Sequence, residues 1–420
     1  MSKDKTIFIS IASYRDPELE PTLKSCIEKA KFPDRLVIKV ARQFTAEDRG
    51  KDDPKSFRKD KRVDITDIPH KQSDGVCKIR SDIQKMYNGE DYILQLDSHH
   101  RFVKDWDVKV IEDLESLKKK HKKPILTAYL PSYDPDNKSS RINFPWEMRF
   151  DRFLPQGPAM PKPETIDDYK TLKEPVRASL MSGHFIFADG SFYEEVLYDP
   201  GLYFHGEEIS LAIRAYTHGY DSFHPIRLIA WHHYTRAGSK RHWDDSGEWD
   251  RLNSESFARY RKLVKIDKSK KGELGPYGLG TERTLNQYIR FSGIDVTNKA
   301  IHKHNLDRQR PPMKYKKGEY KEGFCKKVRY CIDLYKGAVP LDDYDCWVTA
   351  FKDSKGEEIH RKDYPTEEIA MLKRSVENDD NFYKIWTEFE ASTEPVEWLV
   401  WPHSKSKDWC DRIVNKIAVT

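Results

Sequence analysis

The sequence lacks any long run of apolar residues. No stretch reaches the ~18 apolar residues that a membrane-spanning helix requires, and the apolar run in the opening MSKDKTIFISIASY is too short for a signal peptide. We therefore expect no membrane span and a cytoplasmic location. Mean hydropathy is low, at −0.82, but an aromatic share of 12% argues against disorder, because disordered chains are poor in aromatic residues.

Paired cysteines are also lacking. The six cysteines are scattered, without the C-x-x-C spacing of a thiolate zinc site or the density of a disulfide framework. They are predicted to be reduced, buried thiols: Cys26, Cys77, Cys325, Cys331, Cys346 and Cys410.

Neither sign of charge dominates the sequence. The chain has 74 Lys and Arg against 69 Asp and Glu, which gives a net charge of +5, and the two signs are interspersed. Binding along a nucleic acid needs a clustered basic surface, so no nucleic-acid partner is predicted. A small acidic substrate such as a nucleotide is compatible with this balance.

The first hundred residues alternate between strand and helix patterns. Helical spacing of apolar residues follows the first strand, and residues 73–88 form a second helical pattern, with Gly89 placed where a C-cap belongs. This alternation predicts an α/β fold with a parallel sheet, in which ligands bind beyond the carboxyl ends of the strands. The predicted strands cover residues 6–12, 36–41, 63–68 and 92–96.

The remaining chain is expected to form long loops, further α/β elements and a smaller domain. Residues 134–175 show no clean periodicity and are predicted to be loops over a site, whereas 181–188 and 228–232 are predicted strands of the same sheet and 207–219 a helix. The composition shifts near residue 300. We therefore predict a catalytic domain over 1–300 and a small, mainly β accessory domain over 301–420, with strands at 328–334, 346–353 and 396–401.

The segment LQLDSHHRF carries the most specific local signal. Asp97 and His99 lie two residues apart at the end of a predicted strand, so both should lie on one face. A carboxylate oxygen beside an imidazole nitrogen suits Mn²⁺, Zn²⁺ or a similar divalent ion. Such a cation could neutralise the charge of a departing diphosphate. The alternative is that Asp97 caps a turn and His99 is exposed.

A third metal ligand could come from the segment AWHHY. His232 or His233 would complete a set of two histidines and one carboxylate, with coordination positions left for a substrate. The two side chains should point to opposite faces of a strand, so both are not expected to reach one ion. The spacing alone does not choose between them.

Several other residues are candidates for the same site. Glu207 and Glu208 begin a predicted helix, whose dipole would favour an ionised carboxylate able to orient or activate an acceptor hydroxyl. Arg15, with Asp16, follows the first predicted strand, and Arg80 lies on the second predicted helix. Guanidinium groups there could contact a nucleotide, although surface charge also explains each of them. The polar segment at 182–184 could face the same cleft.

These segments together resemble a known family. FISIASYRDPELEPTLKSC, GVCKIRSDIQKMYNGEDYILQLDSHHRF, YFHGEEISLAIRAYTHGYD and YGLGTERTLNQY are similar to the cytoplasmic polypeptide N-acetylglucosaminyltransferases that act on hydroxyproline. That group is itself similar to the polypeptide GalNAc-transferases, which also use an Asp-x-His metal motif and a later histidine. The resemblance covers about residues 5 to 295.

The resemblance implies a GT-A fold and a retaining transfer of a sugar, GlcNAc by this analogy, from a UDP-sugar to a hydroxyl on a protein, either hydroxyproline or Ser/Thr. Asp97, His99 and His232 or His233 would bind Mn²⁺. Arg15, Arg80, Asp97 and Ser98 would contact the donor. Glu207 or Glu208 would lie beside a protein or glycan acceptor.

Two other classes of protein share some of these features. Metallophosphoesterases also use an Asp-x-His pair, but they need further ligands for a second metal, including a GNH turn that the sequence lacks. A non-catalytic sugar-binding or structural protein would account for the aromatic residues, but it would not need DSH together with GEE. The oligomeric state is not predicted.

Overall fold

The structure is a computed structural model that describes residues 5–154, 156–235, 239–270, 272–313, 319–322, 326–374, 381–391 and 393–417. The chain divides into two compact units, of which the first comprises Met1–Asp151 and Gln156–Tyr320, and the second Arg152–Pro155 and Lys321–Thr420. The first unit thus extends to residue 320, beyond the composition change near 300. Cys325 lies outside the described residues.

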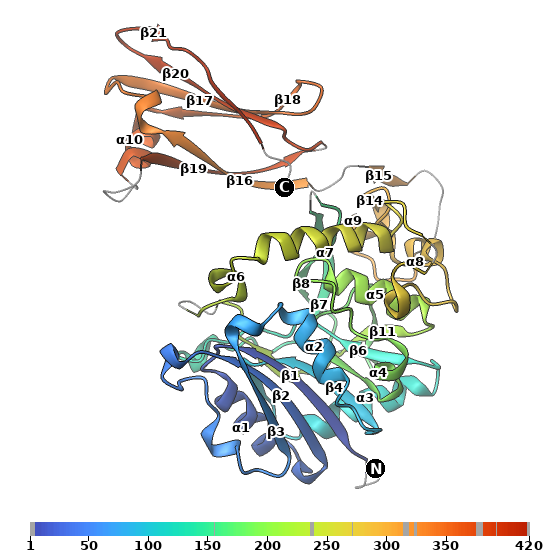
Figure 1. Ribbon diagram of the computed structural model, residues 1–420. Helices are drawn as coiled ribbons and strands as arrows, with labels where there is room; N and C mark the ends of the chain where they lie inside the picture. Colours follow the sequence, from blue (N-terminus) through green and yellow to red (C-terminus); the bar gives the residue numbers. More distant parts are fainter. Residues whose placement is uncertain are drawn as a thin grey trace. The chain divides into compact units, whose positions relative to one another are not determined.

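An eight-stranded sheet forms the centre of the first unit, in the order β3-β2-β1-β4-β10-β6-β11-β9 (Figure 1). The predicted parallel arrangement is confirmed for the first four of these, but β10 runs antiparallel to both β4 and β6. The sheet is therefore mixed. Its strands are β1 Ile7–Tyr14, β2 Leu36–Phe44, β3 Val63–Pro69, β4 Tyr92–Asp97, β6 Pro124–Thr127, β9 Val176–Arg177, β10 Phe185–Asp189 and β11 Asp221–His224.

Helices cover both faces of this sheet, which explains the nearly continuous apolar runs in its strands. In β1, Ile7 and Ile9 join the core beneath α1 and α3, whereas Phe8 joins the core beneath α2, α4 and α5. The helices are α1 Leu19–Lys29, α2 Val76–Gln84, α3 Trp106–Lys118, α4 Ser191–Glu195 and α5 Glu207–Thr217. Helix α2 is shorter than predicted: Lys85 is its C-cap, and Gly89 lies in the loop that follows.

A small second sheet joins two segments that are far apart in the sequence. Strand β5 (His100–Phe102) pairs antiparallel with β12 (Ala230–His232), with His232 opposite His100. The prediction that the strand near 228–232 belongs to the main sheet is therefore wrong. Its partner is the three-residue strand that follows the DSH motif, and such a short strand gives little periodicity to detect.

The segment predicted as loops over residues 134–175 contains a β-hairpin. Strands β7 (Trp146–Phe153) and β8 (Ala159–Thr165) pair with each other. The prediction of loops is therefore wrong for these two strands. The two prolines of β8 and the charged residues of β7 obscure the alternation of apolar and polar residues that marks a strand.

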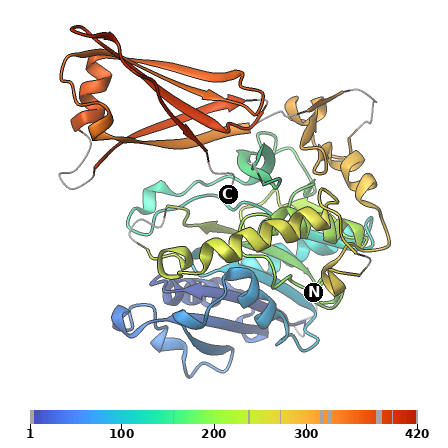
Figure 2. The ribbon, with the colours of Figure 1, turned by 45° about the horizontal axis from the view of Figure 1, so that its top comes forward.

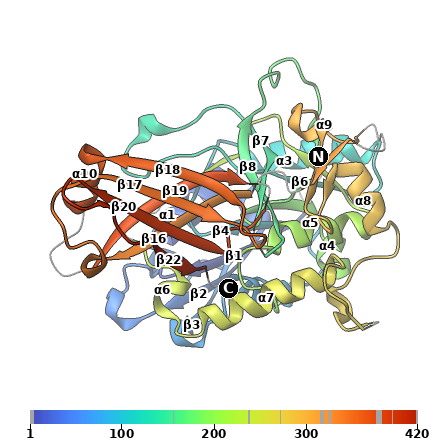
Figure 3. The ribbon, with the colours of Figure 1, turned by 90° about the horizontal axis from the view of Figure 1, so that it is seen from above.

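Two helices that were not predicted from the sequence follow the small second sheet. Helix α6 (His242–Asp245) leads into the long helix α7 (Trp249–Leu263), and the two follow one another along one side of the unit (Figure 3). The later elements are α8 Leu285–Ser292, β13 Ile294–Asp295, β14 Ala300–His302, α9 Lys303–Leu306 and β15 Tyr320–Glu322.

The second unit is mainly β, as predicted. Strands β16 and β19 form one sheet and β17, β18, β20, β21 and β22 another, while α10 (Thr366–Arg374) packs at one end of them (Figure 2). Trp347, Phe351 and Trp398 lie in its separate core. The strands are β16 Lys326–Tyr335, β17 Tyr344–Lys352, β18 Glu358–Pro365, β19 Phe382–Ala391, β20 Glu397–Ser404, β21 Asp408–Trp409 and β22 Ile413–Lys416.

Within the described ranges, no helix combines the length and the apolar character needed to cross a bilayer.

Candidate functional site

A cavity of about 560 Å³ opens in the first unit. Ends of parallel strands line it, as expected for an α/β fold in which ligands bind beyond the carboxyl ends. Tyr14 comes from the end of β1, Gln43 from β2, Asp97 from β4 and Gly206 from the start of α5, while α6 contributes His242.

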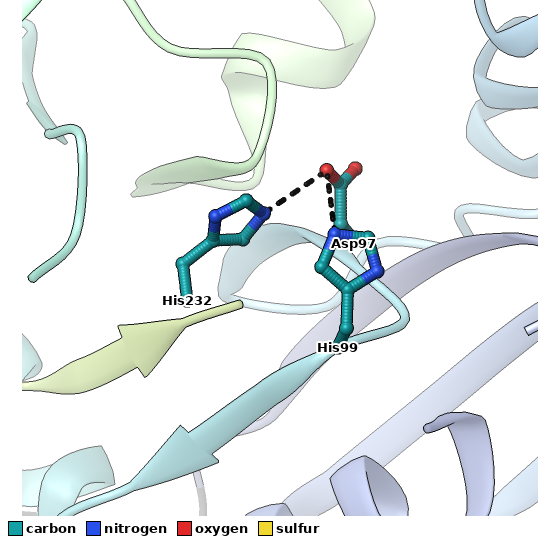
Figure 4. A group of neighbouring side chains, drawn as sticks. All are labelled: Asp97, His99 and His232. Atoms are coloured by element: carbon teal, nitrogen blue, oxygen red, sulfur yellow. Dashed lines mark ion pairs between the residues drawn. The ribbon is translucent and has the colours of Figure 1, made fainter. Parts of the chain in front are cut away.

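Asp97, His99 and His232 lie together in this cavity (Figure 4). The Oδ2 atom of Asp97 is 3.7 Å from His99 Nε2 and 3.5 Å from His232 Nε2. Neither ring nitrogen of His232 has a hydrogen-bond partner among the described residues, although the side chain is only 7% exposed. One carboxylate and two imidazoles around a shared point, one of them buried without a partner, fit a divalent cation such as Mn²⁺ or Zn²⁺.

Strand pairing explains how the three side chains meet. Asp97 ends β4, and after a turn of two residues the chain enters β5, which pairs with β12 and so places His232 beside the DSH motif. His233 is not part of the group; its ring lies 5.8 Å from that of Tyr133. The spacing did not choose between His232 and His233, and in the structure it is His232 that lies beside Asp97 and His99.

The local electrostatics keep Asp97 ionised and His232 neutral. Burial alone would raise the pKa of Asp97, but the adjacent Arg80 guanidinium, with His232 and His99, holds it well below its usual range. Burial lowers the pKa of His232 well below its ordinary value, and the nearby His184 acts in the same direction. An ionised carboxylate and a neutral imidazole are the protonation states that bind metal.

Two further histidines support His232, and neither was predicted as a site residue. The His184 ring stacks on that of His232 at 4.1 Å, and its Nε2 accepts a hydrogen bond from the Leu130 amide at 3.1 Å. Burial lowers the pKa of His100, opposite His232 in the small sheet, to about 3. The only sequence signal for His184 was the polar segment 182–184. His100 could not be predicted, because the sequence does not show that β5 pairs with β12.

Asp16 lies behind His99. Its Oδ2 is 2.7 Å from His99 Nδ1 and accepts a hydrogen bond from the Ser98 hydroxyl at 2.6 Å, and the side chain is 1% exposed. The Ser98 hydroxyl, predicted to contact a donor, is thus bonded to Asp16. The sequence placed Asp16 only after the first strand, because the residues around it do not show that it approaches His99, 83 positions away.

Arg80 joins the Asp97 carboxylate to a second carboxylate. Its guanidinium is 2.5 Å from Asp97 Oδ1 and 2.8 Å from Glu207 Oε1, and it donates to the Tyr198 hydroxyl at 3.0 Å. The side chain lines the cavity but is only 3% exposed. Arg80 thus forms an ion pair with Asp97. Its predicted contact with the donor nucleotide stays a prediction.

The other predicted arginine is not brought to the cavity. The Arg15 guanidinium binds Asp48 and Asp245, each at 2.6 Å, and Arg15 is not among the described residues that line the cavity. These ion pairs tie α6 to the end of β1, because Asp245 is the last residue of α6 and also accepts from the Tyr14 hydroxyl at 2.9 Å.

Glu207 and Glu208 both line the cavity, but their contacts differ. Beyond Arg80, Glu207 accepts hydrogen bonds from the Tyr198 hydroxyl at 2.9 Å and the Cys77 thiol at 2.8 Å. Glu208 accepts from the Tyr129 hydroxyl at 2.6 Å and the Gly183 amide at 2.7 Å. Burial raises the pKa of Glu208 to about 7, which suits a group that exchanges a proton near neutral pH.

An α/β fold with a cavity at the carboxyl ends of its parallel strands is the arrangement in which enzymes of this fold class bind their ligands. The chain belongs to the Glycosyltransferase (GlcNAc) family, whose model matches residues 6–60 and 48–298. The family resemblance inferred from the sequence is therefore confirmed at the level of GlcNAc glycosyltransferases, without the narrower hydroxyproline-specific group. No curated protein matches the sequence.

Solved structures of transferases are similar to this chain at low identity. One is GalNAc-T7 with UDP, GalNAc and Mn²⁺, at 16% identity and a TM-score of 0.43, covering 68% of this chain and 54% of that one. The chain thus spans about half of the GalNAc-T7 chain. Another is residues 1–349 of S. aureus TarS with UDP-GlcNAc, at 11% identity and a TM-score of 0.38, covering 64% of this chain and 69% of that one.

Proposed function

We propose that the chain is a divalent-metal-dependent glycosyltransferase that moves GlcNAc from a UDP-sugar to a hydroxyl group. The observation that carries this proposal is the group of Asp97, His99 and His232, whose ligand atoms lie within 4.8 Å of one another in the cavity. Family membership supports the sugar transfer, and the ligand set supports the metal.

Asp97, His99 and His232 would hold the ion, with Mn²⁺ the expected metal. When bound, such a cation supplies Lewis-acid neutralisation of the charge on a diphosphate leaving group. Arg80 orients Asp97 through the 2.5 Å ion pair and keeps its carboxylate ionised. The residues of the chain thus pre-arrange the site before a donor binds.

The donor nucleotide is proposed to occupy the part of the cavity at the ends of β1 and β2. Tyr14 and Gln43 line the cavity there, and Lys240 and Arg241 add two cations to its lining. A phenol and an amide suit a nucleoside, while cations suit a diphosphate.

Glu208 is the proposed acceptor-side residue. Its two recorded hydrogen bonds leave carboxylate lone pairs for a third partner in the cavity, whereas the Glu207 carboxylate is occupied by Arg80, Tyr198 and Cys77. Glu208 could therefore accept a hydrogen bond or a proton from an incoming hydroxyl. Retention of anomeric configuration, and an acceptor on protein hydroxyproline or Ser/Thr, are proposed from the family resemblance.

The proposal is tested by measuring UDP release from a panel of UDP-sugars with Mn²⁺ or EDTA, comparing wild type with Asp97→Ala. Loss of a metal ligand should abolish release and weaken Mn²⁺-dependent UDP binding, because the diphosphate charge is no longer neutralised. Asp64→Ala is the control, since this carboxylate is 55% exposed and, within the described residues, forms an ion pair only with Lys39.

Release from one sugar, lost with EDTA and with Asp97→Ala, would establish the donor and the metal site together. Unchanged turnover in Asp97→Ala would refute the metal assignment. No release from any donor, with no Mn²⁺-dependent UDP binding, would instead indicate a non-catalytic sugar-binding protein.

A further inference from the structure

We propose that Asp16 is a positioning residue of the metal site, which fixes His99 in the tautomer whose Nε2 lone pair faces Asp97 and His232. The inference rests on the proposed metal site. It adds a residue that contacts neither the cation nor the substrate and acts only through the His99 ring.

The hydrogen bond between Asp16 and His99 has a chemical direction. Asp16 accepts hydrogen bonds from the Ser98 hydroxyl and the Glu18 amide, as an ionised carboxylate does. In that form it can only accept, so the 2.7 Å contact places the proton on His99 Nδ1. In a neutral imidazole the other nitrogen then carries the lone pair. That nitrogen, Nε2, is the atom 3.7 Å from Asp97 Oδ2, on the side where the proposed ligands converge.

Contacts on its own carboxylate hold Asp16 in place. Besides His99, Oδ2 accepts from the Ser98 hydroxyl at 2.6 Å, while Oδ1 accepts from the Glu18 amide at 3.0 Å, at the start of α1. With the side chain 1% exposed, water cannot easily replace these contacts. The loop between β1 and α1 thus fixes the orientation of a ligand that follows β4.

The substitution Asp16→Asn tests the tautomer of His99 while nearly preserving the packing of the side chain. Asn has nearly the same shape and keeps an oxygen for the Glu18 amide, but it replaces the other oxygen by an amide group that donates. The Ser98 hydroxyl can rotate to accept from that group, whereas His99 can accept only by moving its proton to Nε2. That proton would occupy the position of the proposed metal bond.

Asp107→Asn is the matched control. Asp107 is also a buried carboxylate, at 0% exposure, and it accepts from the Lys31 amide at 2.8 Å, the Phe32 amide at 3.1 Å and the Arg35 guanidinium at 2.8 Å. It is not among the residues that line the cavity in the described ranges. The same chemical change there should reduce stability without changing the metal site.

The first measurement needs no metal, and its decisive result comes from the wild-type protein. Nitrogen-15 NMR of the histidine rings in the metal-free protein distinguishes Nδ1–H from Nε2–H, and we expect His99 in the Nδ1–H form. Asp16→Asn should convert it to Nε2–H, and Asp107→Asn should leave it unchanged. A wild-type His99 protonated on Nε2 would overturn the inference, even if Asp16→Asn failed to fold.

The second measurement is Mn²⁺ affinity by titration calorimetry. Asp16→Asn should weaken binding by about 10–100-fold, the usual effect of losing a residue that orients a metal ligand, and excess Mn²⁺ should restore turnover. Wild-type affinity in Asp16→Asn would overturn this inference alone, provided that Asp97→Ala abolishes binding. If wild type bound no Mn²⁺, both this inference and the proposed metal site would fall.

Discussion

Glu207 and Glu208 are neighbours in the sequence but have separate surroundings in the cavity. Glu208 is faced by the Tyr129 and Tyr234 side chains, by Glu207 and by Arg80. Burial, reinforced by the charge of Glu207, raises its pKa to about 7, while Tyr129 and Arg80 oppose that rise. Its charge state should therefore change near neutral pH.

This surrounding predicts a pH-dependent activity. If an acceptor hydroxyl donates to ionised Glu208, kcat should rise as pH increases through about 7, the pKa of the buried carboxyl. Glu208→Gln should lose that step and fall about 10²-fold or more, the usual contribution of general-base catalysis. The measurement is a pH profile of sugar transfer for both proteins.

Glu207→Gln is the control for the profile. Removing the Glu207 charge should move the pH step of Glu208 to lower pH without abolishing it, because that charge raises the pKa of Glu208. A step that persisted unchanged in Glu208→Gln would assign it to another group.

At the scale of elements, the approach of the segment before β10 to α2 and α5 depends on one glycine. A Cβ atom at Gly183 would lie 2.5 Å from Glu207 Oε1 and 2.7 Å from Arg80 Nη1, closer than atoms can pack. Gly183→Ala should separate this buried ion pair and lower the free energy of unfolding by about 1–3 kcal/mol, the usual cost of overpacking. Urea unfolding measures the loss.

Gly247→Ala is the matched change for Gly183→Ala, because a Cβ at Gly247 meets no atom within 4 Å. Its unfolding curve should overlay that of wild type. Equal curves for both variants would show that the segment before β10 can move away from Arg80 and Glu207 at little cost.

At the scale of the whole molecule, the two units have separate cores. Ile7, Leu94 and Trp106 belong to a core of the first unit, and Trp347 and Trp398 to that of the second. We expect calorimetry of the full chain to show two unfolding transitions. Mn²⁺ with UDP should raise the temperature of only one of them, that of the first unit. Ligand at 100 times its dissociation constant should stabilise that unit by about 2.7 kcal/mol. A single transition that shifts as a whole would show that the units unfold together.

The sequence alone determined the α/β character and the position of the first four strands. Strands buried on both faces need continuous apolar runs, and these are visible locally at β1, β2 and β4. The closeness of Asp97 and His99 was also predicted, but not for the right reason. β4 ends at Asp97 and His99 lies in the following turn, so the turn and not strand periodicity brings the two side chains together.

Which distant residues lie beside Asp97 depends on the tertiary structure. His232 rather than His233 joins Asp97 because β12 pairs with β5, a three-residue strand with too little periodicity to detect. Asp16 contacts His99 and the His184 ring stacks on that of His232, each from another loop. Arg80, from α2, forms an ion pair with Asp97. Local sequence determines which face a side chain takes on its own strand or helix, but strand pairing and packing over more than a hundred residues determine what that face meets.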